Sequence, residues 1–271
     1  EKVIGVCHNT DIRQAEKNPA MKDKYVKNLG KLDKILALSS GVIEGISNIY
    51  SYPEDKIVNI GAGYNEKIFY PAEKYEKQNN VKILYAGKFD ESKGFYELIK
   101  AFRLLEEKDN NVELELIGNL KEEDRPRVEA LVGDSKRIKI YNAVDQAHLG
   151  EIMRHKDIFI LPSYFEGLGL IAVEALGSGL RVVATEIEGL IEFLGDTINN
   201  SEIIEYIAMP TIYDTDKAVE EEKPAFVNRI VGALELMIER TREQREIPAE
   251  LLEEIEHHSW KRKIEIIYKL L

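Results

Sequence analysis

The sequence contains a single cysteine, Cys7, so no disulfide can form within the 271-residue chain. This cysteine usage is typical of a reducing compartment, and we expect a cytoplasmic protein. No apolar run approaches the roughly 20 residues that span a bilayer, and no segment resembles a signal peptide. Basic residues are also outnumbered, because 37 Lys and Arg face 49 Asp and Glu, a net charge of −12. This balance argues against non-specific nucleic-acid binding but leaves room for a local basic pocket.

What the chain does contain is an alternation of strand-like and helix-like segments. Strands are predicted at 3–7, 34–38, 57–60, 81–86, 112–117, 138–141, 158–161 and 181–184. Helices are predicted at 22–29, 42–49, 95–107, 125–132, 147–154, 170–176, 225–242 and 249–271. Such a rhythm predicts an α/β fold with parallel sheets covered by helices on both faces.

Two segments interrupt this rhythm. The polar stretch between Gly61 and Asn80 contains Pro71 and several charges, which is typical of a linker between two α/β units. A second irregular stretch, 196–224, is interpreted as an insertion.

The most informative motif is Pro162-Ser-Tyr-Phe-Glu-Gly-Leu-Gly-Leu-Ile-Ala-Val-Glu174. It follows an apolar strand and leads into a helix, so Glu166 is predicted at the carboxyl edge of the sheet, where ligands bind. The amides of Gly167, Leu168 and Gly169 would lie at a helix N-terminus, which favours anions. A carboxylate beside an anion site is costly, so we expect Glu166 to face a neutral polar group such as sugar hydroxyls.

A second motif, Gly87-Lys-Phe-Asp-Glu-Ser-Lys-Gly94, also joins a strand to a helix. Lys88 and Lys93 could bind a diphosphate there, while Gly94 would allow the ligand to approach the backbone closely. Taken alone, the two lysines could equally be solvated surface charges. Together with the glutamate motif they are predicted at one edge of one sheet.

These residues resemble family 4 of the retaining, GT-B-fold glycosyltransferases. The family's donor signature, two glutamates separated by seven residues, is similar to Glu166-Gly-Leu-Gly-Leu-Ile-Ala-Val-Glu174-Ala. Its G-R-L…E-K-G signature is similar to Gly87–Gly94, and its N-G-V-D…F-x-P linker to Ala62–Pro71. The segment from Ser259 to Tyr268 resembles the family's closing helix. The resemblance covers nearly all of the chain.

The resemblance implies a role for each matching residue. Glu166 would contact the hydroxyls of the donor sugar and Glu174 the ribose hydroxyls, while Lys88 and Lys93 would neutralise the leaving diphosphate without a divalent metal. His8, on a strand similar to the one that carries the family's active-site histidine, would face the donor sugar or else simply cap the strand. The implied donor-binding set is Glu174, Gly167, Leu168, Gly169, Leu170, Gly63, Asn65 and Gly87.

Three departures from the family pattern stand out. Lys88 replaces the usual arginine, so a point charge takes the place of a bidentate fork. Asn65 stands where aspartate is typical. A complete first domain of this family would also have a long further stretch before His8, so we expect either a truncated or split enzyme or an unusually small first domain.

The resemblance therefore implies two Rossmann-like units of GT-B type, the N-terminal one abbreviated or truncated. The expected ranges are a partial acceptor-side unit at 1–70, a donor-binding domain at 71–248 and a closing helix at 249–271 that packs back toward the first unit. The expected function is transfer of a hexosyl group from a nucleotide sugar, a UDP-sugar in particular, to a glycan, protein or lipid-linked acceptor, with no cofactor and no metal. A nucleotide-sugar-binding subunit that needs a partner chain and a sugar-nucleotide epimerase remain open as alternatives.

The sequence contains two weaker candidates for a functional site. Asp214-Thr-Asp216 matches the acidic triplet of metal-dependent glycosyltransferases, but its irregular surroundings favour a solvated turn. Lys24, Lys27, Lys31 and Lys34 recur at helical spacing. They form either a solvated helix face or, as the resemblance allows, a contact with the inner membrane surface.

Overall fold

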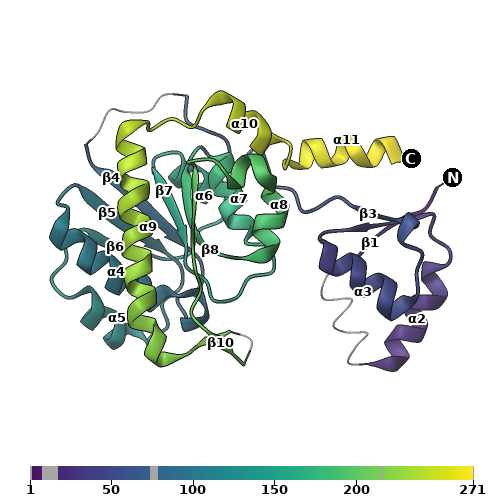
Figure 1. The fold of residues 1–271 in the computed structure, drawn as a ribbon, viewed down its shortest axis with the longest axis horizontal. Coiled ribbons are helices and arrows are strands. Elements are labelled where there is room, and N and C mark those ends of the chain that lie inside the picture. The colour runs from purple at the N-terminus through teal and green to yellow at the C-terminus, as the bar shows by residue number, and fades with distance from the viewer. Residues whose placement is uncertain (1, 8–17, 74–78, 215, 271) are drawn as a thin grey trace. The chain divides into compact units, whose positions relative to one another are not determined.

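The structure, a computed structural model, describes residues 2–7, 18–73, 79–214 and 216–270. The chain divides into two compact units, each with its own sheet and helices (Figure 1). The first comprises Glu1–Gly63 together with His258–Leu271, and the second Tyr64–His257. His8, one of the predicted site residues, lies outside the described residues.

The first unit is a small parallel sheet packed against helices. Its elements are β1 (Ile4–Cys7), α2 (Pro19–Leu29), β2 (Lys34–Ala37), α3 (Ser40–Tyr50), η1 (Glu54–Lys56), β3 (Ile57–Asn59) and α11 (Trp260–Leu270). The strand order is β1-β2-β3. Helix α3 presents Val42, Ile46 and Tyr50, four positions apart, to Ile35 and Ala37 of β2. This spacing puts the three side chains on one helix face, which builds the unit's core.

The second unit contains a six-stranded parallel sheet in the order β6-β5-β4-β7-β8-β9. Its strands are β4 (Val81–Ala86), β5 (Val112–Ile117), β6 (Ile138–Tyr141), β7 (Ile158–Leu161), β8 (Arg181–Thr185) and β9 (Ile204–Ile207). From β4 the chain winds outward through β5 and β6, then returns to pair β7 with the other side of β4. The direction of winding reverses between β4 and β7, and open α/β sheets bind ligands at such a switch point.

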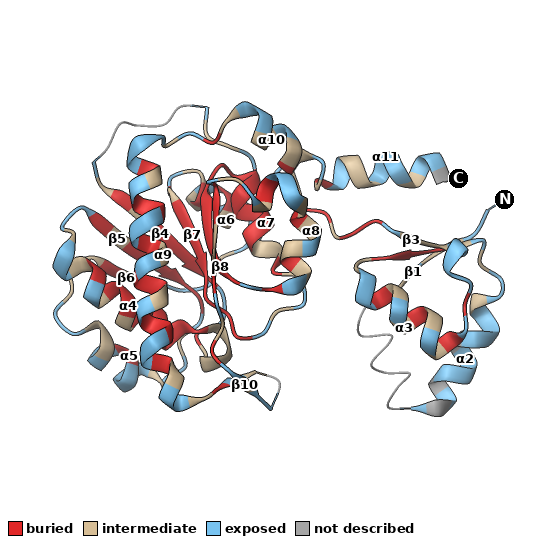
Figure 2. Cartoon of the chain, in the orientation of Figure 1, coloured by how far each residue is buried: buried red, intermediate tan, exposed pale blue. Residues whose placement is uncertain are grey.

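Helices cover both faces of this sheet (Figure 1). One face carries α4 (Phe95–Lys108), α5 (Arg125–Val132) and α9 (Lys223–Glu243), and the other α6 (Gln146–Met153), α7 (Leu170–Gly177), α8 (Glu188–Asn199) and α10 (Ala249–Glu256). Along β4, Ile83 and Tyr85 join the first core while Leu84 and Ala86 join the second. Figure 2 shows that the central strands are buried, and β7 (IFIL) is accordingly apolar throughout, whereas β5 carries the half-buried Glu113 and Glu115. The predicted α/β class with parallel sheets is confirmed.

Two local predictions are wrong. The stretch 196–224, interpreted as an insertion, includes the edge strand β9 and the hairpin of β10 (Ile212–Tyr213) and β11 (Lys217–Ala218), followed by η3 (Glu220–Glu222). The single helix predicted at 249–271 is two helices, and α10 packs against α7 and α8 of the second unit. The helical path restarts at Ser259, whose Oγ accepts a hydrogen bond from the amide of Arg262 at 3.3 Å.

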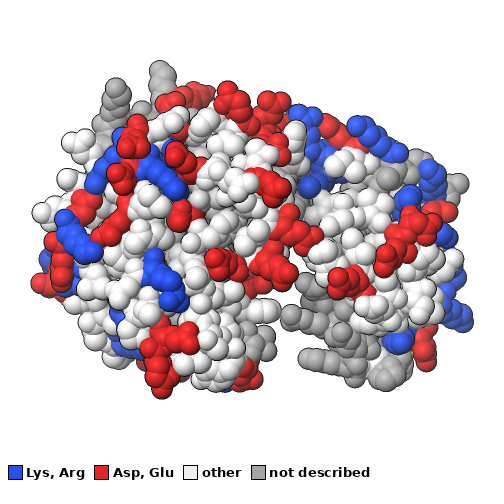
Figure 3. Space-filling view, in the orientation of Figure 1, with Lys and Arg blue, Asp and Glu red and all other residues white. Residues whose placement is uncertain are grey.

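Charge is mixed on the surface of the second unit. On the face shown in Figure 3, acidic and basic side chains are interspersed over the elements around α4 and α9. Across the described ranges, no helix is both long and apolar enough to cross a membrane.

Candidate active site

The turns that follow β4 and β7 touch each other at the switch point. Gly94 closes the first turn with a φ of 62°, and a Cβ at this position would lie 2.1 Å from the carbonyl oxygen of Pro162. The amide of Tyr164 donates a hydrogen bond to the carbonyl of Ser92 at 2.8 Å. The two predicted motifs, distant in sequence, therefore share backbone contacts at one edge of the sheet.

Lys93 and Glu166 connect the two turns through their side chains. Lys93 Nζ lies 2.7 Å from Glu166 Oε1 and donates a second hydrogen bond to the carbonyl of Phe165 at 3.0 Å. Ser163 Oγ donates to the same Oε1 at 3.0 Å. The side chains of Lys93 and Glu166 are 22% and 21% exposed, so the contact is shielded but open to a ligand.

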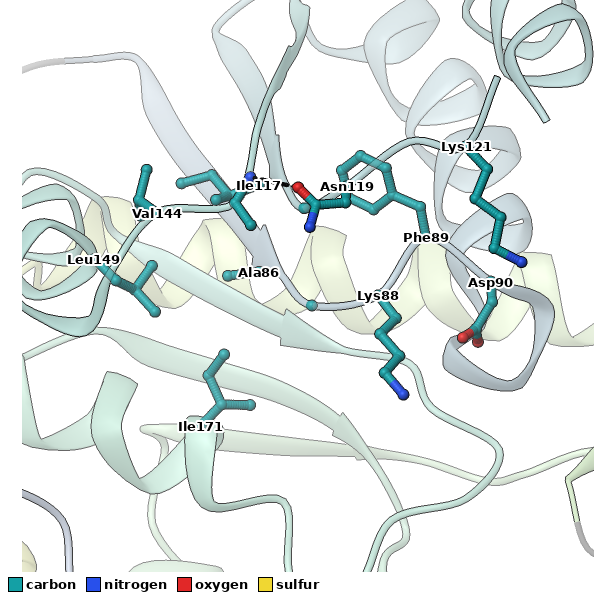
Figure 4. Close-up of a pocket in the computed structure, with 13 residues that line it drawn as sticks. Ala86, Lys88, Phe89, Asp90, Ile117, Asn119, Lys121, Val144, Leu149 and Ile171 are labelled. Atoms are coloured by element: carbon teal, nitrogen blue, oxygen red, sulfur yellow. Dashed lines mark hydrogen bonds between the residues drawn. The ribbon is translucent and has the colours of Figure 1, made fainter. Parts of the chain in front are cut away.

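Lys88 lies beside a cavity of about 510 Å³ (Figure 4). The cavity is bounded by the turn after β4, the turn after β5 and the first turn of α7, with Phe89, Val144, Leu149 and Ile171 as apolar walls. Lys88 and Lys93 thus belong to one turn but face different surroundings, one the cavity and the other Glu166. The size suits a drug-sized organic group.

Helix α7 begins at the turn that carries Glu166. Gly169 precedes it with a φ of 71°, and in the described structure no side chain caps this helix start. A Cβ at Gly167 would meet no atom within 4 Å, so the backbone is accessible there. Gly169 itself is buried, whereas Gly167 is exposed, and uncapped amides at a helix N-terminus attract anions. Leu168 and Leu170 flank Gly169 in the same turn.

Glu174 lies on α7, 8% exposed. Burial raises the pKa of its carboxyl group to about 7, since the charged form loses solvation. Hydroxyl groups that donate hydrogen bonds stabilise the ionised form of such a buried carboxyl group, because they replace the lost water.

Gly63 and Asn65 have local contacts of their own. A Cβ at Gly63 would lie 2.6 Å from the ring of Trp260, within the first unit. Asn65 Oδ1 accepts from the amide of Lys67 at 3.1 Å and starts a turn in the second unit. Neither residue lines the cavity, and their role in donor binding stays a prediction.

Several residues at the cavity were missed by the sequence reasoning. Asn119 follows Gly118 directly after β5, and its Oδ1 accepts from the amide of Ala143 at 3.3 Å, which turns the amide nitrogen toward the cavity (Figure 4). Lys121 also lines the cavity. The available signal was a glycine and a polar residue immediately after a strand, the same signal that identified the other two turns.

The acidic pair near β10 has a partner of its own. Asp214 lies 2.6 Å from Lys217, and this contact lowers the pKa of the Asp214 carboxyl. Among the described residues, no three His, Cys, Asp or Glu side chains come together as a metal site would require.

The chain matches a known protein family. Residues 52–206, more than half of the chain, match the family model described as "Glycosyl transferases group 1". The matched range includes both turns and the cavity.

Curated relatives carry glycosyltransferase names. The capsular polysaccharide biosynthesis glycosyltransferase CapM of Staphylococcus aureus is 29% identical over 217 residues, covering 74% of this chain and 49% of CapM. An uncharacterized glycosyltransferase of Methanocaldococcus jannaschii is 26% identical over 180 residues, covering 61% of this chain and 45% of that protein. The chain thus spans about half the length of these relatives.

Solved structures share the fold. Sucrose-phosphate synthase of Thermosynechococcus elongatus superposes with a TM-score of 0.66 at 19% identity, covering 98% of this chain and 66% of the other. Anabaena HepE, solved in complex with UDP and glucose, gives 0.65 at 16% identity, covering 100% and 71%. These similarities support the two-unit GT-B architecture.

Proposed function

The chain belongs to the group 1 glycosyl transferases, and we propose that it transfers a hexosyl group from a UDP-sugar to an acceptor hydroxyl with retention at the anomeric carbon. The observation that carries this proposal is the contact between Lys93 and Glu166, which joins the two turns at the switch point of the sheet. It brings a cation suited to a diphosphate beside a carboxylate suited to sugar hydroxyls. The solved neighbour with bound UDP and glucose supports the choice of donor class.

The departing diphosphate would be stabilised by positive groups from both turns. Lys88 and Lys93 supply two charges from one turn, and the uncapped start of α7 supplies main-chain donors from the other. Charge that develops on the leaving oxygen would meet donors already in place, so little reorganisation is needed during the reaction. With this charge supplied by the protein, the proposed reaction requires neither a divalent metal nor a cofactor.

Glu166 would change partner when the donor binds. In the free protein its carboxylate is held by Lys93 and Ser163. A diphosphate competes for the Lys93 ammonium, and the released carboxylate can then accept hydrogen bonds from the sugar hydroxyls. Donor binding would thereby couple the diphosphate subsite to the sugar subsite.

The nucleoside would bind in the cavity and to Glu174. Its base fits the cavity between the apolar walls, with the Asn119 amide nitrogen as donor to a base carbonyl. Its ribose hydroxyls would donate hydrogen bonds to Glu174 and so stabilise the ionised form of this buried carboxyl group.

The decisive test measures UDP release and product stereochemistry. The chain is incubated with UDP-glucose, UDP-galactose or UDP-N-acetylglucosamine and simple glycoside acceptors, and the product anomer is assigned by proton NMR. We expect an α-configured product from an α-configured donor. Glu166→Gln should lower transfer by about 10²- to 10³-fold, the usual cost of losing one group that acts in the transition state.

The matched control is Glu235→Gln. Glu235 forms an ion pair of similar length, 2.8 Å, with Lys108, away from the switch point. We expect this variant to keep full transfer. An inverted product would reject retention, and equal activity of both variants would reject the role of Glu166.

A second candidate follows from the position of the proposed donor-binding residues Lys93, Glu166 and Glu174, all of which lie in the second unit. It is a nucleotide-sugar-binding subunit that turns nothing over until a partner supplies the acceptor side. UDP binding by calorimetry without UDP release in the donor panel would support this candidate over the first.

A further inference from the structure

Tyr85 lies beneath the turn that carries Lys88. It is the penultimate residue of β4 and is 1% exposed. Its hydroxyl donates a hydrogen bond to the main-chain carbonyl of Lys88 at 2.5 Å. Its ring packs against Phe89 and Phe95, with centroids 6.2 and 5.8 Å away.

The backbone around this hydrogen bond has little room to move. A Cβ at Gly87 would lie 3.1 Å from the Tyr85 hydroxyl oxygen, and a Cβ at Gly118 would lie 2.1 Å from the carbonyl of Gly87. The Lys88 carbonyl is thus directed into the core, while its side chain lines the cavity (Figure 4). The hydroxyl therefore fixes the main chain from which the Lys88 ammonium extends.

The hydroxyl remains a donor at every physiological pH. Burial is the largest cause of a raised pKa of Tyr85, and the negative charges of Asp90 and Glu166 raise this pKa further. A neutral hydroxyl also adds no negative charge close to where a diphosphate would bind.

We propose that Tyr85 is a positioning residue, which acts through the Lys88 carbonyl to hold the Lys88 ammonium where a diphosphate binds. The inference rests on the proposed function, since it requires Lys88 to contact the diphosphate. A cation that is already oriented loses less freedom when the ligand arrives, so binding is tighter. Tyr85 itself touches no ligand.

The test is a double-mutant cycle with inorganic pyrophosphate as the probe. Dissociation constants are measured by calorimetry for the full chain, Tyr85→Phe, Lys88→Ala and the double variant. Tyr85→Phe removes one hydroxyl and leaves the ring to pack against Phe89 and Phe95. We expect it to weaken binding about three- to tenfold, the value of one hydrogen bond. In the Lys88→Ala background it should weaken binding no further, because the two residues act in series.

Tyr206→Phe is the matched control. Its partly buried hydroxyl donates to Asn199 Oδ1 at 2.6 Å beside the core at β9, so the same atom is lost at another site. This variant should bind pyrophosphate as the unmodified chain does. A merely structural role for Tyr85 predicts equal weakening in both backgrounds, and that result overturns the inference.

The two proposals fail in different ways. If Lys88→Ala weakens pyrophosphate binding and Tyr85→Phe does not, the positioning role is rejected while the diphosphate site stands. If the unmodified chain binds neither pyrophosphate nor UDP, or if Lys88→Ala leaves both affinities unchanged, the diphosphate assignment is rejected and the role of Tyr85 is rejected with it.

Discussion

The turn after β4 and the turn after β7 meet at the same edge of the sheet, but they are held in different ways. The first is fixed by its own residues, since Asp90 accepts from the amide of Lys93 and Tyr85 holds the carbonyl of Lys88. The second depends on its neighbour, because Lys93 binds both the Glu166 carboxylate and the Phe165 carbonyl. The cationic turn is therefore preformed, while the carboxylate of the other turn is held both by Lys93 of that turn and by Ser163 of its own.

The largest effect is expected from removing the cation that joins the turns. Lys93→Met should weaken pyrophosphate binding about 10- to 100-fold, since hydrogen bonds to charged groups contribute roughly 1.5–3 kcal/mol. It also leaves the Glu166 carboxylate with the hydrogen bond from Ser163 but without the ion pair. Calorimetry measures the affinity, and Lys108→Met, which breaks the ion pair with Glu235, is the control. Unchanged affinity in Lys93→Met would show that the two turns do not cooperate in binding.

The backbone contact between the turns can be broken with one methyl group. Gly94→Ala places a Cβ 2.1 Å from the Pro162 carbonyl at a φ of 62°, so we expect a loss of about 2–4 kcal/mol in the free energy of unfolding. Gly167→Ala is the matched control, because a Cβ there meets nothing within 4 Å. Urea unfolding compares the two variants. Equal stability would mean that the turns can separate without cost.

The β7 side of the site should also carry a pH dependence. The Glu174 pKa rises from 4.5 in the unfolded chain to about 7 in the folded protein. Its protonated form favours folding below about pH 4.5, and that contribution is lost as pH rises to about 7. We expect Glu174→Gln to gain about 2–3 kcal/mol relative to the unmodified chain across this range. Urea unfolding at pH 5 and pH 7.5 measures the difference, and a pH-independent offset would contradict it.

The smallest effect would sharpen the comparison most. Glu166→Gln releases Lys93 without removing it, so pyrophosphate affinity should rise about two- to fivefold, in line with a partly exposed ion pair. Transfer from a UDP-sugar should fall in the same variant. If pyrophosphate affinity fell as well, Glu166 would assist diphosphate binding rather than compete with the diphosphate for Lys93. Glu235→Gln again serves as the control.

Sequence reasoning located the two turns because strand ends and glycines are local signals. It placed Glu166, Lys88 and Lys93 at carboxyl ends of strands, where the structure has them. It missed β9, a four-residue strand that ends at Ile207, because a short edge strand has little periodicity of its own. Asn119 was missed as well, since its part in the cavity depends on the amide of Ala143, 24 positions away.

The sequence by itself determined most of the strands and helices, though not α8 and β9, and which polar residues end them, because side-chain periodicity and turn chemistry act over a few neighbouring residues. Only the tertiary structure decided that β7 pairs with β4, and so that Lys93 contacts Glu166, 73 positions later. That pairing results from burying both faces of a sheet whose strands are far apart in sequence. Tyr85 shows the same limit: its apolar ring is evident from the strand pattern, whereas its hydroxyl acquires a partner only when the turn folds back over it.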